Sequence, residues 1–96
     1  MGLSNRHCRT LCAIFEEPTR ADVIWSDFVA LCLALGAEMP KPGRTSGSRQ
    51  RIKLRGRKAV FHRPHPGPTM KKGSVESARV FLINAGVTPE TEGCRC

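Results

Sequence analysis

The stretch that decides the fold runs from Arg51 to His62 and reads Arg-Ile-Lys-Leu-Arg-Gly-Arg-Lys-Ala-Val-Phe-His. Its first half alternates cations with apolar residues, and a period of two is typical of a strand with one face buried. Gly56 then stands where a tight hairpin turn needs a residue that tolerates a positive φ. The stretch therefore predicts a β-hairpin with strands over 51–55 and 58–62, apolar on one face and cationic on the other.

Apolar residues at helical spacing predict three helices around this hairpin. A short helix is expected over 9–17. The second helix has Ser26 as its expected N-cap and Gly36 as its left-handed stop. The third has Ser74 as its expected N-cap and ends at Gly86. The expected order along the chain is thus helix, helix, hairpin, helix.

These elements predict an α+β domain, with a small three-stranded antiparallel sheet and two main helices on one of its faces. The third strand is expected around 37–39. The chain divides into an N-terminal extension with a short helix (1–20), the domain itself (21–88) and a flexible tail (89–96). Residues from both layers are expected to share the core, namely Phe28, Leu31, Leu35, Ile52, Leu54 and Leu82.

The charges are segregated along the chain. The formal net charge is +8, from 16 Lys and Arg against 8 Asp and Glu. Between 39 and 75 there is no acidic residue, yet the same segment holds eleven Lys and Arg. A block of one sign over the middle of a small domain indicates a polyanionic partner. No apolar helix face accompanies the block, and no apolar run is long enough to span a membrane, so nucleic acid is favoured over lipid.

Five cysteines raise the alternatives of disulfides and a metal site. Their number is odd, no secretory signal precedes them, and a cytoplasmic location is therefore expected, where disulfides are rare. Cys94 and Cys96 have no second cysteine pair at the spacing of a zinc site. The interpretation is that Cys12 and Cys32 are small buried residues, that the tail carries two thiols, and that no metal is bound.

Three further segments carry short motifs of Gly, Pro and Lys. They are Leu35-Gly36-Ala37 with the later Gly47-Ser48, then Phe61-His62-Arg63-Pro64-His65-Pro66-Gly67, then Lys71-Lys72-Gly73-Ser74-Val75 with Ala85-Gly86-Val87. In this order and at this spacing they resemble the HicA toxins of type II toxin–antitoxin systems. The resemblance covers roughly 21–87.

The resemblance implies a fold like that of double-stranded-RNA-binding domains, and cleavage of mRNA with no metal or other cofactor. It also implies neutralisation by a HicB-like antitoxin. The family's catalytic histidine is the last residue of a Gly-Ser-His motif. Here that motif is similar to Gly47-Ser48-Arg49, so the catalytic position holds an arginine.

Metal-free RNA cleavage needs a base for the 2′-OH proton, an acid for the leaving 5′-oxygen and cations for the phosphorane. Arg49 cannot act as the base because its guanidinium stays protonated, although it could bind the phosphate. His65 is the leading candidate for proton transfer, since it is similar to a loop histidine of many family members, and His62 is the second. The competing interpretation gives them structural roles, in a packed loop and an edge strand.

The residues expected to bind RNA are cations of the basic block. They are Arg49, Arg51, Lys53, Lys58, Arg63, Lys71 and Lys72, with the backbone N–H groups of Gly47 and Ser48 as a phosphate-contacting loop. The sequence therefore predicts a HicA-like toxin that binds and cleaves mRNA. The alternative is a basic RNA-binding module that has lost its catalytic histidine. A ribosome-associated structural protein would fit the charge but not the order of the motifs.

Overall fold

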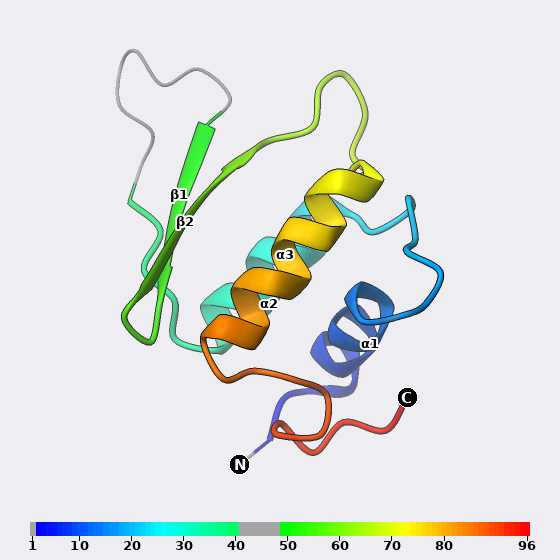
Figure 1. The fold of residues 1–96 in the computed structure, drawn as a ribbon, viewed down its shortest axis with the longest axis vertical. Coiled ribbons are helices and arrows are strands. Elements are labelled where there is room, and N and C mark those ends of the chain that lie inside the picture. Colours follow the sequence, from blue (N-terminus) through cyan, green and yellow to red (C-terminus); the bar gives the residue numbers. More distant parts are fainter. Residues whose placement is uncertain (1, 41–48) are drawn as a thin grey trace.

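The computed structural model describes residues 2–40 and 49–96. Along the chain they form α1 (Asn5–Ile14), α2 (Trp25–Ala34), β1 (Arg49–Leu54), β2 (Arg57–His62) and α3 (Lys72–Asn84). The hairpin of β1 and β2 lies on one side, α2 and α3 lie in the middle, and α1 lies on the other side (Figure 1). The predicted α+β class is confirmed. No helix in the described ranges has the length and apolar character needed to cross a membrane.

The hairpin forms as the alternating pattern predicts. β1 and β2 are antiparallel, and the register pairs Leu54 with Arg57 at the turn and Arg49 with His62 at the open end. Arg55 and Gly56 at the turn have φ of 48° and 81°. Two positive φ values match the twist of the flanking strands, which is why two-residue hairpin turns favour them.

The predicted three-stranded sheet is not confirmed, because the described residues form a sheet of two strands. Glu38 makes a single bridge to Lys53, with N–H···O distances of 2.8 and 2.9 Å. The next step of this ladder would need an N–H from Pro40, which has none. The side-chain amide of Gln50 instead donates to the carbonyls of Pro40 (3.0 Å) and Arg51 (2.9 Å). One proline therefore limits the third segment to a bridge.

The inner face of the hairpin packs on both central helices. The ring of Phe61 on β2 lies 5.2 Å from that of Phe28 on α2 and 5.8 Å from that of Phe81 on α3, both edge to face. Trp25 extends this cluster, 5.8 Å from Phe28. Of the residues predicted to form the core, all but Leu35 are completely or almost completely buried, and Leu35 packs partly buried against them. The predicted core is confirmed.

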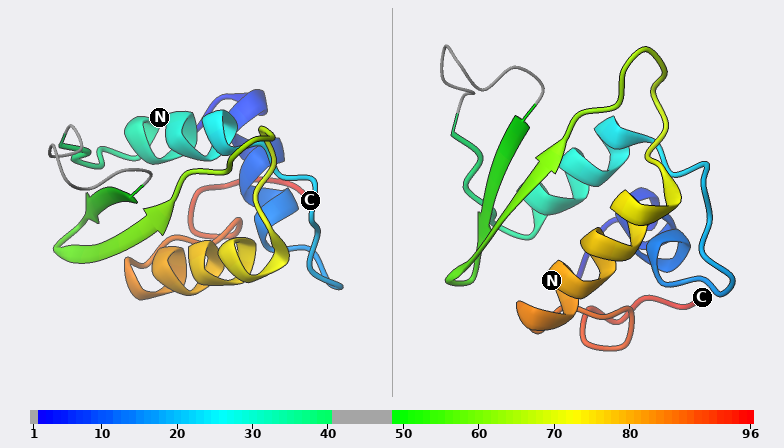
Figure 2. Two further views of the ribbon diagram at one scale, coloured as in Figure 1. Left: turned by 90° about the horizontal axis from the view of Figure 1, so that it is seen from above. Right: turned by 45° about the horizontal axis from the view of Figure 1, so that its top comes forward.

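The starts of α2 and α3 differ from the predicted N-caps. α2 begins at Trp25 and α3 at Lys72, and neither has a side-chain cap. The segments that precede them lie side by side, because the Trp25 N–H donates to Pro68 O (2.9 Å) and the Met70 N–H donates to Val23 O (2.8 Å). This contact fixes extended backbone immediately before both helices (Figure 2). Tertiary pairing, rather than Ser26 or Ser74, therefore sets where they start.

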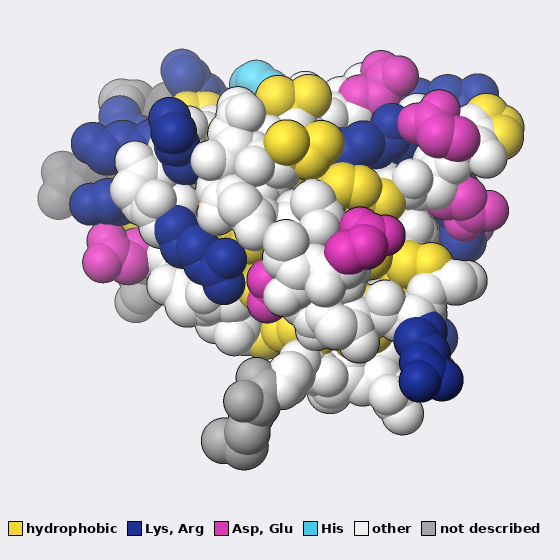
Figure 3. Space-filling view, turned by 60° about the horizontal axis from the view of Figure 1, so that its bottom comes forward, with side chains coloured by type: hydrophobic (Ala, Val, Ile, Leu, Met, Phe, Trp, Pro, Cys, Tyr) yellow, Lys and Arg dark blue, Asp and Glu magenta, His cyan; other side chains and the backbone are white. Residues whose placement is uncertain are grey.

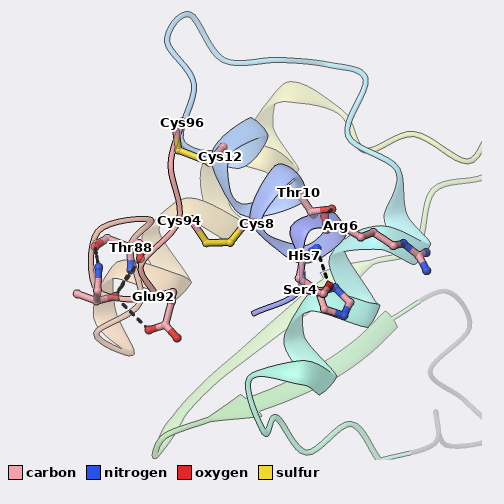
Figure 4. Close-up of a disulfide and its surroundings, with 11 residues drawn as sticks. Ser4, Arg6, His7, Cys8, Thr10, Cys12, Thr88, Glu92, Cys94 and Cys96 are labelled. Carbon is pink, nitrogen blue, oxygen red and sulfur yellow. Dashed lines mark hydrogen bonds between the residues drawn. A yellow bond between two sulfur atoms is a disulfide. The ribbon is translucent and has the colours of Figure 1, made fainter. Parts of the chain in front are cut away.

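The cysteine interpretation was wrong for Cys12, Cys94 and Cys96, which form disulfides, and Cys8 is paired as well. Cys8 and Cys12 lie one turn apart on α1 and form disulfides with Cys94 and Cys96 (Figure 4). Cys32 is buried and free, as predicted. Sequence spacing alone could not reveal the pairing, because it depends on α1 and the C-terminal segment meeting in space.

The C-terminal segment was expected to be a flexible tail. In the structure it makes a turn in which the N–H groups of Thr88 and Thr91 each donate to the other's hydroxyl, at 2.8 and 3.1 Å. Pro89 is buried, and the carboxylate of Glu92 lies 3.8 Å from the guanidinium of Arg55 at the hairpin turn. The disulfides thus attach the segment to α1, and this ion pair connects it to the hairpin turn.

Candidate nucleic-acid interface

The outer face of the hairpin gathers most of the predicted RNA-binding residues of the two strands. β1 alternates strictly between exposed and buried side chains, and its exposed residues are Arg49, Arg51 and Lys53. Directly opposite them on β2 lie His62, Val60 and Lys58, all exposed. Residues directly opposite in an antiparallel pair share a face. We call these six residues the cationic face.

Arg49 and His62 are direct neighbours on this face. Side chains of directly opposite residues have Cβ atoms about 4.5–5.5 Å apart, so a guanidinium and an imidazole can reach one phosphate group from two strands. Arg49 is the residue expected from the sequence at the family's catalytic position. The strand register therefore places one of the two candidate histidines beside that position, which the sequence alone did not reveal.

A second group of candidates meets where β2 leads towards α3. A pocket of about 420 Å³ is lined by His62, His65, Lys71 and Ser74, together with Arg63. Met70 is buried at its base and anchors the chain before α3. Lys71 is the N-cap residue of α3 and Lys72 its first residue, where the helix dipole also favours anions. The two candidate histidines therefore line one pocket, which adjoins the cationic face at His62.

Most of the acidic residues pair with cations away from this face, whereas the exposed Glu38 lies directly opposite Lys53 beside it. In the part of the chain that the structure describes, ion pairs join Arg6 to Asp27, Arg20 to Glu16 and Asp22, Arg55 to Glu92, and Arg79 to Glu17. None of them uses a cation of the cationic face. Lys and Arg gather on the hairpin side with an acidic side chain beside them, and both signs mix on the opposite side (Figure 3). Among the described residues, the cations of the cationic face thus take part in none of these ion pairs, whereas Arg55 at the hairpin turn does.

Two predicted contacts lie outside the described residues, namely Gly47 and Ser48. Within ranges 2–40 and 49–96, no group of three or more His, Cys, Asp or Glu is placed to hold a metal ion. The one free thiol is also poorly suited to chemistry, because burial raises the pKa of Cys32 to about 12.

A protein-family model matches the segment that carries the cationic face. A family model described as the HicA toxin of bacterial toxin–antitoxin systems matches residues 25–87, from the first residue of α2 to just beyond α3. The match includes the whole cationic face and both candidate histidines, and it excludes α1 and all four paired cysteines. No curated protein and no solved structure matches the chain. Because the model covers well over half of the chain, this protein belongs to the HicA family of toxins of bacterial toxin–antitoxin systems.

Proposed function

We propose that this protein is a ribonuclease toxin that binds and cleaves mRNA without a metal, and that a HicB-like antitoxin neutralises it. The observation that carries the proposal is the placement of Arg49 directly opposite His62 on the cationic face, beside the pocket that also holds His65. A phosphate bound by Arg49 would lie next to the imidazole of His62, and the pocket that His62 lines also holds His65. Metal-free RNA cleavage needs that combination of a cation and two proton carriers.

The residues divide the chemistry as follows. His65 takes the proton of the 2′-OH, the 2′-oxygen attacks phosphorus, and the bond from phosphorus to the 5′-oxygen breaks. His62 gives a proton to that leaving oxygen, so the products are a 2′,3′-cyclic phosphate and a 5′-OH. Arg49 stabilises the extra negative charge of the phosphorane by bidentate hydrogen bonds.

The rest of the basic surface holds the RNA in place. Arg51, Lys53 and Lys58 continue the cationic face away from His62. Arg63 and Lys71 line the pocket, and Lys72 follows Lys71 as the first residue of α3. Contacts of this kind to phosphates position the strand and release counterions. Gly47 and Ser48 would add backbone N–H groups. We further propose that the domain has the double-stranded-RNA-binding-domain-like fold of its family, with the segment at Glu38 in the place of the third strand.

Cleavage of mRNA also supports a cytoplasmic site of action. The cytosol keeps most thiols reduced, so we expect the disulfides of α1 to be exposed to reduction there. These disulfides lie outside the family match, and the proposed chemistry uses no cysteine.

The second candidate function is RNA binding without cleavage. The observation that favours it is the arginine at the family's catalytic position, since guanidinium cannot take a proton. The two functions separate in one assay of RNA cleavage in the presence of EDTA. The assay compares the wild type with His65→Ala, His62→Ala and Arg49→His, and His7→Ala on α1 is the matched histidine control.

For the toxin we expect cleavage by the wild type and by His7→Ala, and a loss of about 100-fold or more for each of the other two histidine variants. A wild type that is inert, with activity gained in Arg49→His, would instead establish the binding module. Equal cleavage by the wild type, His62→Ala and His65→Ala would contradict the assigned roles.

A further inference from the structure

One edge of the hairpin is open. The N–H and C=O of Lys53 both bond to Glu38, so Lys53 turns its backbone polar groups away from β2. In an antiparallel ladder, a residue whose polar groups point away from its partner strand belongs to a non-hydrogen-bonded pair. Its partner in that pair is Lys58. Lys58 therefore also turns its N–H and C=O outward, away from β1.

The alternation of the ladder extends this result along β2. Val60 and His62 lie two and four residues beyond Lys58, so their N–H and C=O groups point the same way. Among the described residues, none makes a backbone hydrogen bond to these groups. The free edge of β2 thus offers three residues with unpaired donors and acceptors. Proteins usually cover or charge such an edge, because it pairs readily with another strand.

A groove adjoins the turn end of this edge, at Lys58. A cavity of about 710 Å³ is lined by Arg57, Lys58 and Ala59 of β2 and by one stripe of α3. The stripe repeats every three or four residues through Gly73, Ser77, Val80 and Asn84. Gly73 and Ser77 are small, and the Val80 side chain is 55% exposed. Beside Lys58 there is therefore room for an added strand between β2 and α3, and Val60 and His62 continue the edge beyond the groove.

The two sides of the groove differ in chemistry. On the outer side, the side chains of Lys58 and His62 belong to the cationic face. On the inner side, Ala59 of β2 faces Val80 and Phe81 of α3. Glu76 also lines the helix wall, so a carboxylate on the inner side would be repelled. A strand that fits this groove carries acidic residues on one face and apolar residues on the other.

We propose that the free edge of β2 binds an extended segment of the antitoxin by β-augmentation, and that this segment alternates acidic and apolar residues. The proposal rests on the proposed function for the existence of that partner. Main-chain hydrogen bonds to Lys58, Val60 and His62 supply affinity, and the two faces of the groove supply specificity. Because the edge ends at His62, the added strand lies against the candidate catalytic surface and excludes RNA from it.

A capped peptide of three Glu-Val repeats is the probe, and a peptide with the same residues in two blocks is its control. The readout is amide hydrogen exchange, followed residue by residue by NMR. Saturating probe should slow exchange at Lys58, Val60 and His62 by about tenfold or more, as expected for amides that gain a hydrogen bond. Ala59 and Phe61, which bond to β1, serve as internal references.

Val60→Pro tests the same edge by mutation. Proline removes the outward N–H without removing a bond to β1, whereas Val60→Ala keeps that N–H. Val60→Pro should weaken binding of the probe about tenfold, and Val60→Ala by less than about twofold. If circular dichroism shows that Val60→Pro is unfolded, the exchange measurement on the wild type decides alone.

Four outcomes would overturn the proposal. The first is that the probe does not bind, and the second is that it binds without protecting the three amides. The third is that a single-stranded RNA protects the amides to the same degree as the probe does. The fourth is that protection of these amides rises with protein concentration in the absence of any probe, which would show that a second copy of the chain occupies the edge. RNA binding by the wild type is measured separately, so failure of the proposed function is distinguished from failure of the edge.

Discussion

Opening the two disulfides of α1 is the perturbation whose cost the structure defines best. Cys8–Cys94 and Cys12–Cys96 close loops of 86 and 84 residues in sequence separation, and so join the two ends of the chain. In the chain-entropy model, a cross-link stabilises a protein by restricting its unfolded state, and more so for a longer loop. The variants are Cys8→Ala with Cys94→Ala, Cys12→Ala with Cys96→Ala, and all four together.

The loss of unfolding free energy expected for each variant follows from the length of the loop that each disulfide closes. Either disulfide alone closes the long loop, which is worth about 4.5 kcal/mol. With one in place, the other closes only a small ring through one turn of α1 and the last residues, worth roughly 2.5 kcal/mol. Removing either pair should therefore cost about 2.5 kcal/mol, and removing both about 7 kcal/mol. The costs are not additive, and the larger one is comparable to the whole stability of a chain of this size, about 5–15 kcal/mol.

Urea unfolding at equilibrium measures these differences, with circular dichroism as the probe and a common slope as the check on two-state behaviour. Thiol titration after denaturation supplies the control, because the wild type should show one free thiol, that of Cys32, and the reduced protein five. The reasoning is refuted if the fourfold variant unfolds at the wild-type urea concentration. It is also refuted if each pair costs as much alone as both do together.

Three further outcomes are expected. RNA affinity should fall steeply with salt, with a logarithmic slope of about −0.7 for each phosphate neutralised, and a slope near zero between low and physiological salt would contradict an electrostatic interface. Leu31→Ala and Leu82→Ala should each cost about 2–5 kcal/mol in urea unfolding because both side chains are fully buried, whereas Leu33→Ala, at a side chain 54% exposed, should cost far less. Since its pKa is raised to about 12, the Cys32 thiol should resist iodoacetamide at pH 8 until the protein unfolds, and rapid alkylation of the native protein, seen by mass spectrometry, would show that it is not buried.

Much of the fold was predictable because it follows from local patterns. The alternation across Ile52 and Leu54 reports which face of a strand is buried, and the stripe through Phe28 and Leu31 does the same for a helix. These patterns need no knowledge of which segments meet. The cationic outer face of the hairpin was predicted for the same reason.

The errors arose where contacts between distant segments override local preference. Ser26 and Ser74 are good caps in isolation, but the pairing of the segments before α2 and α3 starts both helices earlier. The third strand was expected from its position in the chain, and Pro40 prevents its ladder from extending. The cysteines were judged by compartment and spacing, whereas their pairing depends on the meeting of α1 with the C-terminal segment.

The sequence by itself determined that this is a small α+β protein with a segregated positive charge, and its motifs indicated the HicA family, which the family match confirmed. Composition and periodicity are properties of residues close together in the sequence, so they can be determined without a structure. Only the tertiary structure decided that Arg49 stands opposite His62, that α1 is joined to the C-terminal segment, and that one edge of β2 is free. Each of these depends on the register or contact of segments far apart in the chain, because a shift of one residue in a strand turns every side chain to the other face.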